Sequence, residues 1–245
     1  MFKNTIFRRM TALVLTLALA AAAALPGLAV YPMPIQTASE TEAVYLFNAD
    51  TGKTILNQNA DQQQYVASLT KLMTALLLLE SGKDLNGEVT VPTALTQEFR
   101  DIQNANGTTM GLRIGETVRR IDLLNALLIT SANDAASVIA WDVGGSLNAF
   151  IQQMNARAAE LGCTSATFTC AHGLYDYGNV ASAEDMAKIA AACAANETFA
   201  QVAGSTTYTL GQTNFHSEQR TISSSNPLMD TSGAYYKDSV KWVKG

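Results

Sequence analysis

Residues 65–80 read YVASLTKLMTALLLLE, and this stretch predicts a helix over 68–80. The apolar run that follows Lys71 can bury that lysine. Ser68 and Lys71 are three positions apart, so their side chains share one helix face at the first turn. A serine nucleophile with a lysine base has this spacing, because burial lowers the pKa of a lysine. A serine N-cap followed by a solvated lysine has it too, and both interpretations stay open here.

A second polar group, Ser131-Ala132-Asn133, separates two predicted helices at 120–130 and 134–143. Apolar residues are too dense in the first of these helices for a single face, which indicates burial on most sides. Polar groups between two buried helices need hydrogen-bond partners. A turn in which Asn133 caps the next helix would explain the same letters. Two other S-x-N copies exist, but only this one interrupts a buried helical pair.

The remaining pattern predicts strands towards both ends of the sequence and helices in the middle. This order indicates an α+β or α/β domain in which a sheet built from both ends packs against a helical region. The expected elements are a β-hairpin over 43–58, a strand at 89–92, helices at 146–162 and 182–195, a strand at 205–210 that pairs with 220–223, and a closing strand at 239–245.

The composition excludes several classes of function. The 245 residues carry a formal net charge of −5 and show no clustered basic residues outside the N-terminus, which argues against nucleic acid as a partner. Two histidines and three cysteines lack metal-ligand spacing, so neither zinc nor another cofactor is expected. Cys163 and Cys170 could form a disulfide, although buried free thiols are favoured.

The N-terminus is typical of a secretory signal peptide. Lys3, Arg8 and Arg9 precede an apolar run over 10–25, and small residues follow before a predicted cleavage after Ala29. A permanent membrane anchor is the alternative, but a spanning helix needs about 20 apolar residues. The predicted organisation is therefore a signal peptide over 1–29, a linker over 30–42 and one domain over 43–245.

A third polar candidate is Lys244, which with Gly245 ends the strand-like SVKWVKG. A lysine at this place can hold a carboxylate of a substrate. A polar residue at a strand end is the simpler alternative.

The order S-x-x-K, S-x-N, K-[T]-G resembles that of penicillin-binding proteins and serine β-lactamases. Longer blocks extend the resemblance. FNADTGKTILNQNADQQQYVASLTKLMT and GLRIGETVRRIDLLNALLITSANDAASVIAWDVGG are similar to the D-alanyl-D-alanine carboxypeptidases, the low-molecular-mass penicillin-binding proteins. The similarity runs in order from about residue 43 to 193, and weakly to 245.

This resemblance implies a β-lactamase/transpeptidase-like α+β domain, with a mainly antiparallel sheet and a helical region, that performs serine acyl transfer. Ser68 would attack the carbonyl between two terminal D-alanines, and Lys71 would accept its proton. Ser131 and Asn133 would relay protons and hold the substrate amide, and Lys244 would bind the terminal carboxylate.

The implied partners are peptidoglycan stem peptides ending in D-Ala-D-Ala, and β-lactams as covalent inhibitors, with no cofactor and no nucleic acid. The implied place is the cell wall outside the cytoplasmic membrane, with attachment through a C-terminal anchor as an option. A D,D-endopeptidase, a serine β-lactamase and a non-catalytic peptidoglycan-binding protein remain alternatives within the same fold. A β-lactamase would call for S-D-N and a glutamate that activates water.

Several positions depart from the family pattern. Val66 and Ala171 stand where proline is usual, and Gly245 replaces the threonine of K-T-G. The family continues beyond this point, so the sequence is expected to be C-terminally incomplete and, as it stands, inactive. His172 is expected to make a structural hydrogen bond under the site and not to act as the base of a serine triad.

Overall fold

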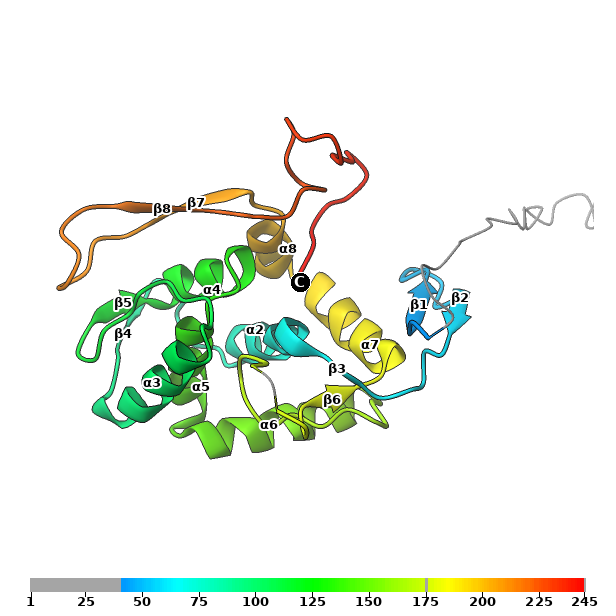
Figure 1. The fold of residues 1–245 in the computed structure, drawn as a ribbon, viewed down its shortest axis with the longest axis horizontal. Helices are drawn as coiled ribbons and strands as arrows, with labels where there is room; N and C mark the ends of the chain where they lie inside the picture. The colour runs from blue at the N-terminus through cyan, green and yellow to red at the C-terminus, as the bar shows by residue number, and fades with distance from the viewer. Residues whose placement is uncertain (1–40, 175, 245) are drawn as a thin grey trace, which may run out of the picture. The chain divides into compact units, whose positions relative to one another are not determined.

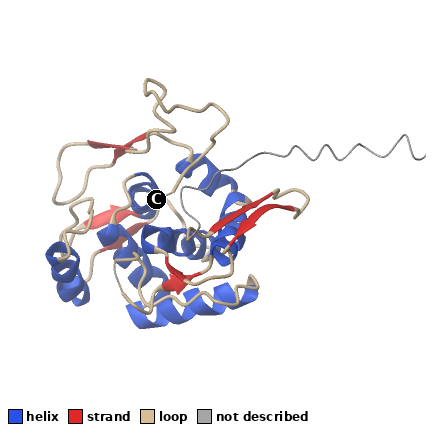
Figure 2. Ribbon diagram, turned by 45° about the vertical axis from the view of Figure 1, so that its right-hand side comes forward, coloured by secondary structure: helices blue, strands red, loops and turns tan. Residues whose placement is uncertain are grey.

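The computed structural model describes residues 41–174 and 176–244, which belong to one unit of the chain, Ser39–Gly245. The predicted signal peptide and residues 30–40 of the predicted linker lie outside the described residues. Figure 1 shows the order of the elements along the chain, and Figure 2 shows the helices grouped together with short strands around them. This mixture confirms the predicted α+β class.

Helix α2 (Thr70–Glu80) lies at the centre of the helical group. It contacts five other helices, which is why nearly all of its residues are buried. A helix that is apolar all round finds partners on every side. The other helical elements are η1 (Ala67–Leu69), η2 (Thr93–Leu95), α3 (Thr96–Asn104), α4 (Arg120–Ile129), α5 (Asn133–Gly144), α6 (Leu147–Glu160), α7 (Ala183–Ala194) and α8 (Glu197–Ala203).

Two helix starts follow directly from local sequence. Ser146 caps α6 by accepting a hydrogen bond from the Ala149 N–H at 3.1 Å. Ser182 caps α7 in the same way, from Asp185 N–H at 3.1 Å. Side-chain oxygens satisfy backbone donors that a helix leaves free at its first turn. The predicted helix at 182–195 and its cap are thereby confirmed.

The strands form four separate antiparallel pairs in the described part of the chain. The expected single sheet built from both ends is not among them, because the hairpin at each end of the described chain makes ladder hydrogen bonds only within itself. The pairs are β1 (Val44–Phe47) with β2 (Thr54–Gln58), β3 (Gln64–Tyr65) with β6 (Val180–Ala181), β4 (Glu88–Thr90) with β5 (Thr117–Arg119), and β7 (Thr207–Leu210) with β8 (Arg220–Ser223).

The predicted closing strand at 239–245 is wrong for the residues that are described, 239–244. A strand needs a neighbour for its ladder of hydrogen bonds. Here the Val240 N–H turns back to the Lys237 carbonyl at 3.1 Å, and the Trp242 ring packs edge-on against Phe199 of α8, with ring centroids 5.1 Å apart. This aromatic contact therefore fixes the segment that carries Lys244.

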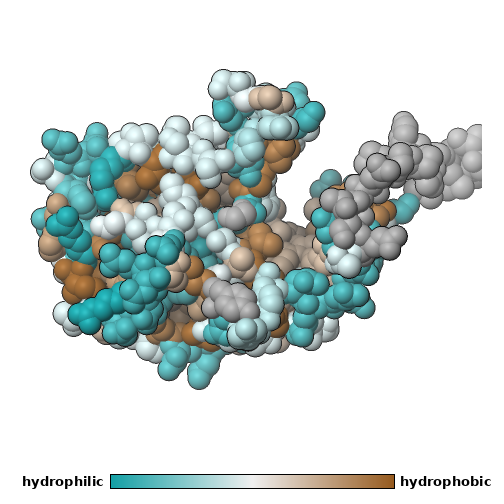
Figure 3. Space-filling view, in the orientation of Figure 1, coloured by the Kyte–Doolittle hydropathy of each residue, from teal (hydrophilic) through white to brown (hydrophobic). Residues whose placement is uncertain are grey.

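Two further observations concern the same unit. Cys163, Cys170 and Cys193 are free thiols, so the disulfide considered between the first two is not formed. Among residues 41–174 and 176–244, no helix combines the length and hydropathy that crossing a membrane requires. In the space-filling view, hydrophilic side chains cover much of the visible face and hydrophobic ones show between them (Figure 3).

Candidate functional site

Ser68 lies in the single turn η1, immediately before α2, and is half-buried. The preceding Ala67 has a φ of 44°, which is a left-handed conformation that alanine rarely adopts. Gly173 approaches this turn so closely that a Cβ at that position would overlap the Ala67 carbonyl. The backbone that presents Ser68 is thus held in an unusual conformation by contact with the 170–174 loop.

Lys71 stands at the start of α2 and is fully buried. Its Nζ lies 3.3 Å from Ser68 Oγ, 2.8 Å from Asn133 Oδ1 and 2.5 Å from the His172 carbonyl oxygen. Burial, together with the charge of Lys244, lowers the pKa of Lys71 to about 7. A lysine with that pKa is partly neutral near pH 7, so it can accept a proton from the serine.

Asn133 begins α5, directly after the short break that separates it from α4. Its amide group donates from Nδ2 to the Thr108 carbonyl at 2.9 Å, which leaves Oδ1 for Lys71. The break itself contains Ser131, whose φ of 60° is again left-handed. The polar groups of this interruption are therefore paired, as the position between two buried helices requires.

Asp134 connects the break between α4 and α5 to a neighbouring loop. Its buried carboxylate accepts hydrogen bonds from the backbone N–H groups of Met110, Gly111 and Leu112 at 2.9–3.0 Å. Burial raises the pKa of Asp134, whereas these N–H donors lower it. One carboxylate thus ties the start of α5 to the loop before β5.

Lys244 reaches the site from the end of the described chain. Its Nζ donates to Ser131 Oγ at 3.0 Å, and burial lowers its pKa to about 8. A cavity of about 190 Å³ is lined by Ser131, Lys244 and residues 224–226. Lys244 is therefore positioned beside the S-x-N group, although it does not lie in a strand.

The structure brings together all five residues singled out from the sequence. Ser68 and Lys71 are adjacent, Asn133 contacts Lys71, and Ser131 contacts Lys244. The described part of the chain holds no group of three or more His, Cys, Asp or Glu side chains suited to a metal ion.

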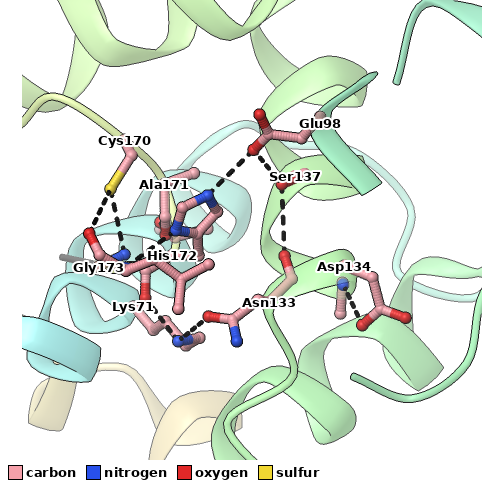
Figure 4. A network of polar contacts seen from close by, with 12 residues as sticks. Lys71, Glu98, Asn133, Asp134, Ser137, Cys170, Ala171, His172 and Gly173 are labelled. Atoms are coloured by element: carbon pink, nitrogen blue, oxygen red, sulfur yellow. Dashed lines mark hydrogen bonds and ion pairs between the residues drawn. The ribbon is translucent and has the colours of Figure 1, made fainter. Parts of the chain in front are cut away.

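Sequence reasoning missed Glu98 of α3. Its Oε1 accepts hydrogen bonds from His172 Nε2 at 3.0 Å and from Ser137 Oγ at 2.8 Å (Figure 4). These partners lie 74 and 39 residues away, so no local spacing could have found the contact. His172, in turn, hydrogen-bonds Glu98 through its ring beside the site, and its backbone carbonyl accepts a hydrogen bond from Lys71.

A cavity of about 390 Å³ adjoins this second group. Glu98, Cys170 and His172 contribute to its lining, but Ser68 and Lys71 do not. The two groups therefore meet at His172, whose ring belongs to one and whose carbonyl belongs to the other.

The comparisons with known proteins agree with this geometry. A family model described as D-alanyl-D-alanine carboxypeptidase matches residues 32–239. The D-alanyl-D-alanine carboxypeptidase DacF of Bacillus subtilis is 32% identical over 158 residues, which cover 63% of this chain and 39% of the relative. A D-alanyl-D-alanine endopeptidase of Pseudomonas aeruginosa is 33% identical over 157 residues, covering 64% and 48%. The chain thus spans less than half the length of these relatives.

Solved structures resemble this one over most of its length. The Streptomyces K15 DD-transpeptidase matches with a TM-score of 0.70 and 29% identity, over 77% of this chain and 74% of that one. A D-alanyl-D-alanine carboxypeptidase from Mycobacterium tuberculosis matches with a TM-score of 0.67 and 26% identity, over 81% and 74%. The predicted transpeptidase-like fold is confirmed.

Proposed function

Because the chain belongs to the D-alanyl-D-alanine carboxypeptidase family, we propose that it removes the terminal D-alanine from peptidoglycan stem peptides through an acyl-enzyme on Ser68. One observation carries the proposal. The Lys71 amine is buried, has a pKa lowered to about 7, and lies within hydrogen-bond distance of Ser68 Oγ. A serine becomes a nucleophile when a base at this distance takes its proton.

In the proposed reaction, Ser68 Oγ transfers its proton to Lys71 and attacks the carbonyl between the two D-alanines. The backbone N–H of Ser68 is one donor to the resulting oxyanion, and such donors typically lower the barrier by about 3–4 kcal/mol. The proton then passes to the departing amine, and D-alanine leaves. Water hydrolyses the ester and regenerates the serine.

The other residues hold the substrate in this scheme. Asn133 would bind the substrate amide, and Ser131 would relay the proton to the leaving group. Lys244, whose ammonium lies 3.0 Å from Ser131 Oγ, would bind the terminal carboxylate of the peptide. The reaction uses no cofactor.

The N-terminal segment sets the proposed location. A signal peptide over 1–29 would direct the domain over 43–245 across the cytoplasmic membrane, with residues 30–42 as a linker. Its substrate would then be the peptidoglycan of the cell wall, and β-lactams would acylate Ser68 in place of the stem peptide. No nucleic acid takes part.

Labelling with a fluorescent penicillin tests the proposal. We expect the full-length wild-type protein to form a covalent adduct and its Ser68→Ala variant to form none. Ser81→Ala is the matched control, because Ser81 is exposed at the other end of the same helix. Absence of an adduct from folded wild-type protein would refute the acyl-transfer proposal and leave a non-catalytic peptidoglycan-binding role.

A D,D-endopeptidase that cuts cross-links is the second candidate, since relatives in Pseudomonas aeruginosa and Escherichia coli bear that name. Two substrates separate the candidates. Release of D-alanine from a stem pentapeptide supports the carboxypeptidase, whereas cleavage of a cross-linked muropeptide dimer without that release supports the endopeptidase. Rapid turnover of a penicillin with neither activity would indicate a serine β-lactamase.

A further inference from the structure

We propose that Glu98 is a positioning residue for the acyl-transfer reaction, because its carboxylate binds the ring of His172, whose carbonyl accepts from Lys71, and the hydroxyl of Ser137, one turn from Asn133. This inference rests on the proposed function and adds a residue from outside the three sequence motifs. Glu98 lies on α3, and its side chain is 23% exposed. Hydrogen bonding from His172, more than any other contact, lowers the pKa of Glu98, so the group is an ionised acceptor near neutral pH.

The first arm of the arrangement runs through His172. The Leu174 N–H donates to His172 Nδ1 at 3.0 Å, so Nε2 carries the proton that Glu98 accepts. Burial lowers the pKa of the ring, but Cys170 and Glu98 raise it to about 9, and in the charged ring Nδ1 carries a proton and no longer accepts from Leu174. Nε2 donates to Glu98 in either charge state, so this contact holds the ring, and the backbone carbonyl of His172 points at Lys71 (Figure 4).

The second arm runs through Ser137, one turn along α5 from Asn133. Ser137 Oγ lies 2.8 Å from Glu98 Oε1 and 3.3 Å from the Asn133 carbonyl oxygen. The single hydroxyl hydrogen goes to the nearer and charged acceptor, Glu98, and this bond attaches the first turn of α5 to α3. The Asn133 side chain, which supplies Oδ1 to Lys71, projects from that same turn.

The chemistry of an amine explains why both arms matter. A neutral lysine has two N–H donors and one lone pair. When Asn133 Oδ1 and the His172 carbonyl take the two donors, the lone pair is left for Ser68 Oγ, 3.3 Å away. Without fixed acceptors the amine can rotate about its last bond, and a misdirected base loses much of its effect. Glu98 Oε1 binds the ring of the residue that supplies one acceptor and the Ser137 hydroxyl one turn from the other, while the Thr108 carbonyl also holds the Asn133 amide.

The test compares the acylation rate constants of purified variants with a fluorescent penicillin, from pH 6 to pH 10, per folded molecule. We expect Glu98→Ala to lower the rate about 10- to 100-fold throughout this pH range. Glu98→Gln keeps an oxygen at the same place and is expected to stay within about threefold of wild type. Asp101→Ala, an exposed carboxylate one turn along the same helix, is the control and is expected to leave the rate unchanged.

The pH profile separates positioning from other roles. If Glu98 acted only on the protonation of Lys71, raising the pH would restore the wild-type rate in Glu98→Ala. If it served only stability, the folded molecules would acylate at the wild-type rate. Either outcome overturns the inference and leaves the proposed function intact, whereas failure of wild-type acylation refutes both. Should Glu98→Ala not fold, Ser137→Ala removes one arm alone and must slow acylation at least threefold.

Discussion

The burial of Lys71 makes a quantitative prediction about stability. In the folded protein its pKa is about 7, against 10.5 for an unburied lysine. Between these values the unfolded chain binds more protons than the folded one, so stability rises with pH. Each unit of difference is worth about 1.4 kcal/mol. From pH 7 to pH 9 this one group should therefore add about 2 kcal/mol to the free energy of unfolding.

The perturbation is Lys71→Met, which keeps an unbranched chain of similar length and removes the titrating amine. It also leaves Asn133 Oδ1 and the His172 carbonyl without their donor, which costs stability by an amount that does not depend on pH. The informative quantity is thus the difference between variant and wild type as a function of pH. Titrating groups that do not interact with Lys71 occur in both proteins and cancel, and Lys244, whose charge is coupled to that of Lys71, is the exception.

Urea denaturation at pH 7, 8 and 9 measures this difference. We expect wild type to gain about 2 kcal/mol relative to Lys71→Met across that range, or roughly 4–8 °C in melting temperature. Lys53→Met, at an exposed position, should show a profile parallel to wild type. Parallel profiles for Lys71→Met and wild type would show that the lysine is not depressed in pKa, and the argument for it as a base would fail.

Three further predictions follow from the site. Gly173→Ala should destabilise the protein by at least about 3 kcal/mol in urea, because φ is +78° and the new methyl group overlaps the Ala67 carbonyl; a loss below about 1 kcal/mol would contradict this. Asp134→Asn turns an amide N–H₂ towards the N–H donors of the 110–112 loop and should cost about 2–4 kcal/mol of stability. The melting temperature measures this loss, and an unchanged value would show that Asp134 does not hold the loop. The pH profile of penicillin acylation should rise near pH 7 as Lys71 loses its proton and fall above about pH 8 as Lys244 loses its charge; a profile with one limb would exclude one of these roles.

The parts of the site that could be predicted from sequence are those in which chemistry is local. Ser68 and Lys71 share one turn, so their spacing alone brings them together. The break at Ser131 was recognisable because it interrupts two helices too apolar to be exposed. Packing of those helices against α2 then brings Asn133, at the end of the break, into hydrogen-bond contact with Lys71.

Other features were beyond local sequence reasoning. Glu98 acts on partners brought close only by tertiary packing, and its neighbours in sequence resemble any exposed helix. The strand predicted at 239–245 rested on alternating apolar residues, but pairing decides whether such a run becomes a strand. In this segment Trp242 packs on Phe199 and no neighbouring strand pairs with it, so no strand forms in the described residues 239–244. The left-handed backbone at Ala67 also escaped detection, since no glycine marks it.

Buried Lys71 and half-buried Lys244 make the stability of the protein depend on whether an anion is bound beside them. Burial penalises the charge of each amine, and the charge of Lys244 further disfavours protonation of Lys71, so keeping both amines charged costs the folded state free energy. A small anion with a carboxylate would relieve that cost as it binds and would thereby raise the temperature of unfolding, by an amount that grows with the logarithm of its concentration relative to its dissociation constant. The melting temperature of the protein, measured with each of a panel of carboxylates, would then rank candidate ligands without any assay of turnover.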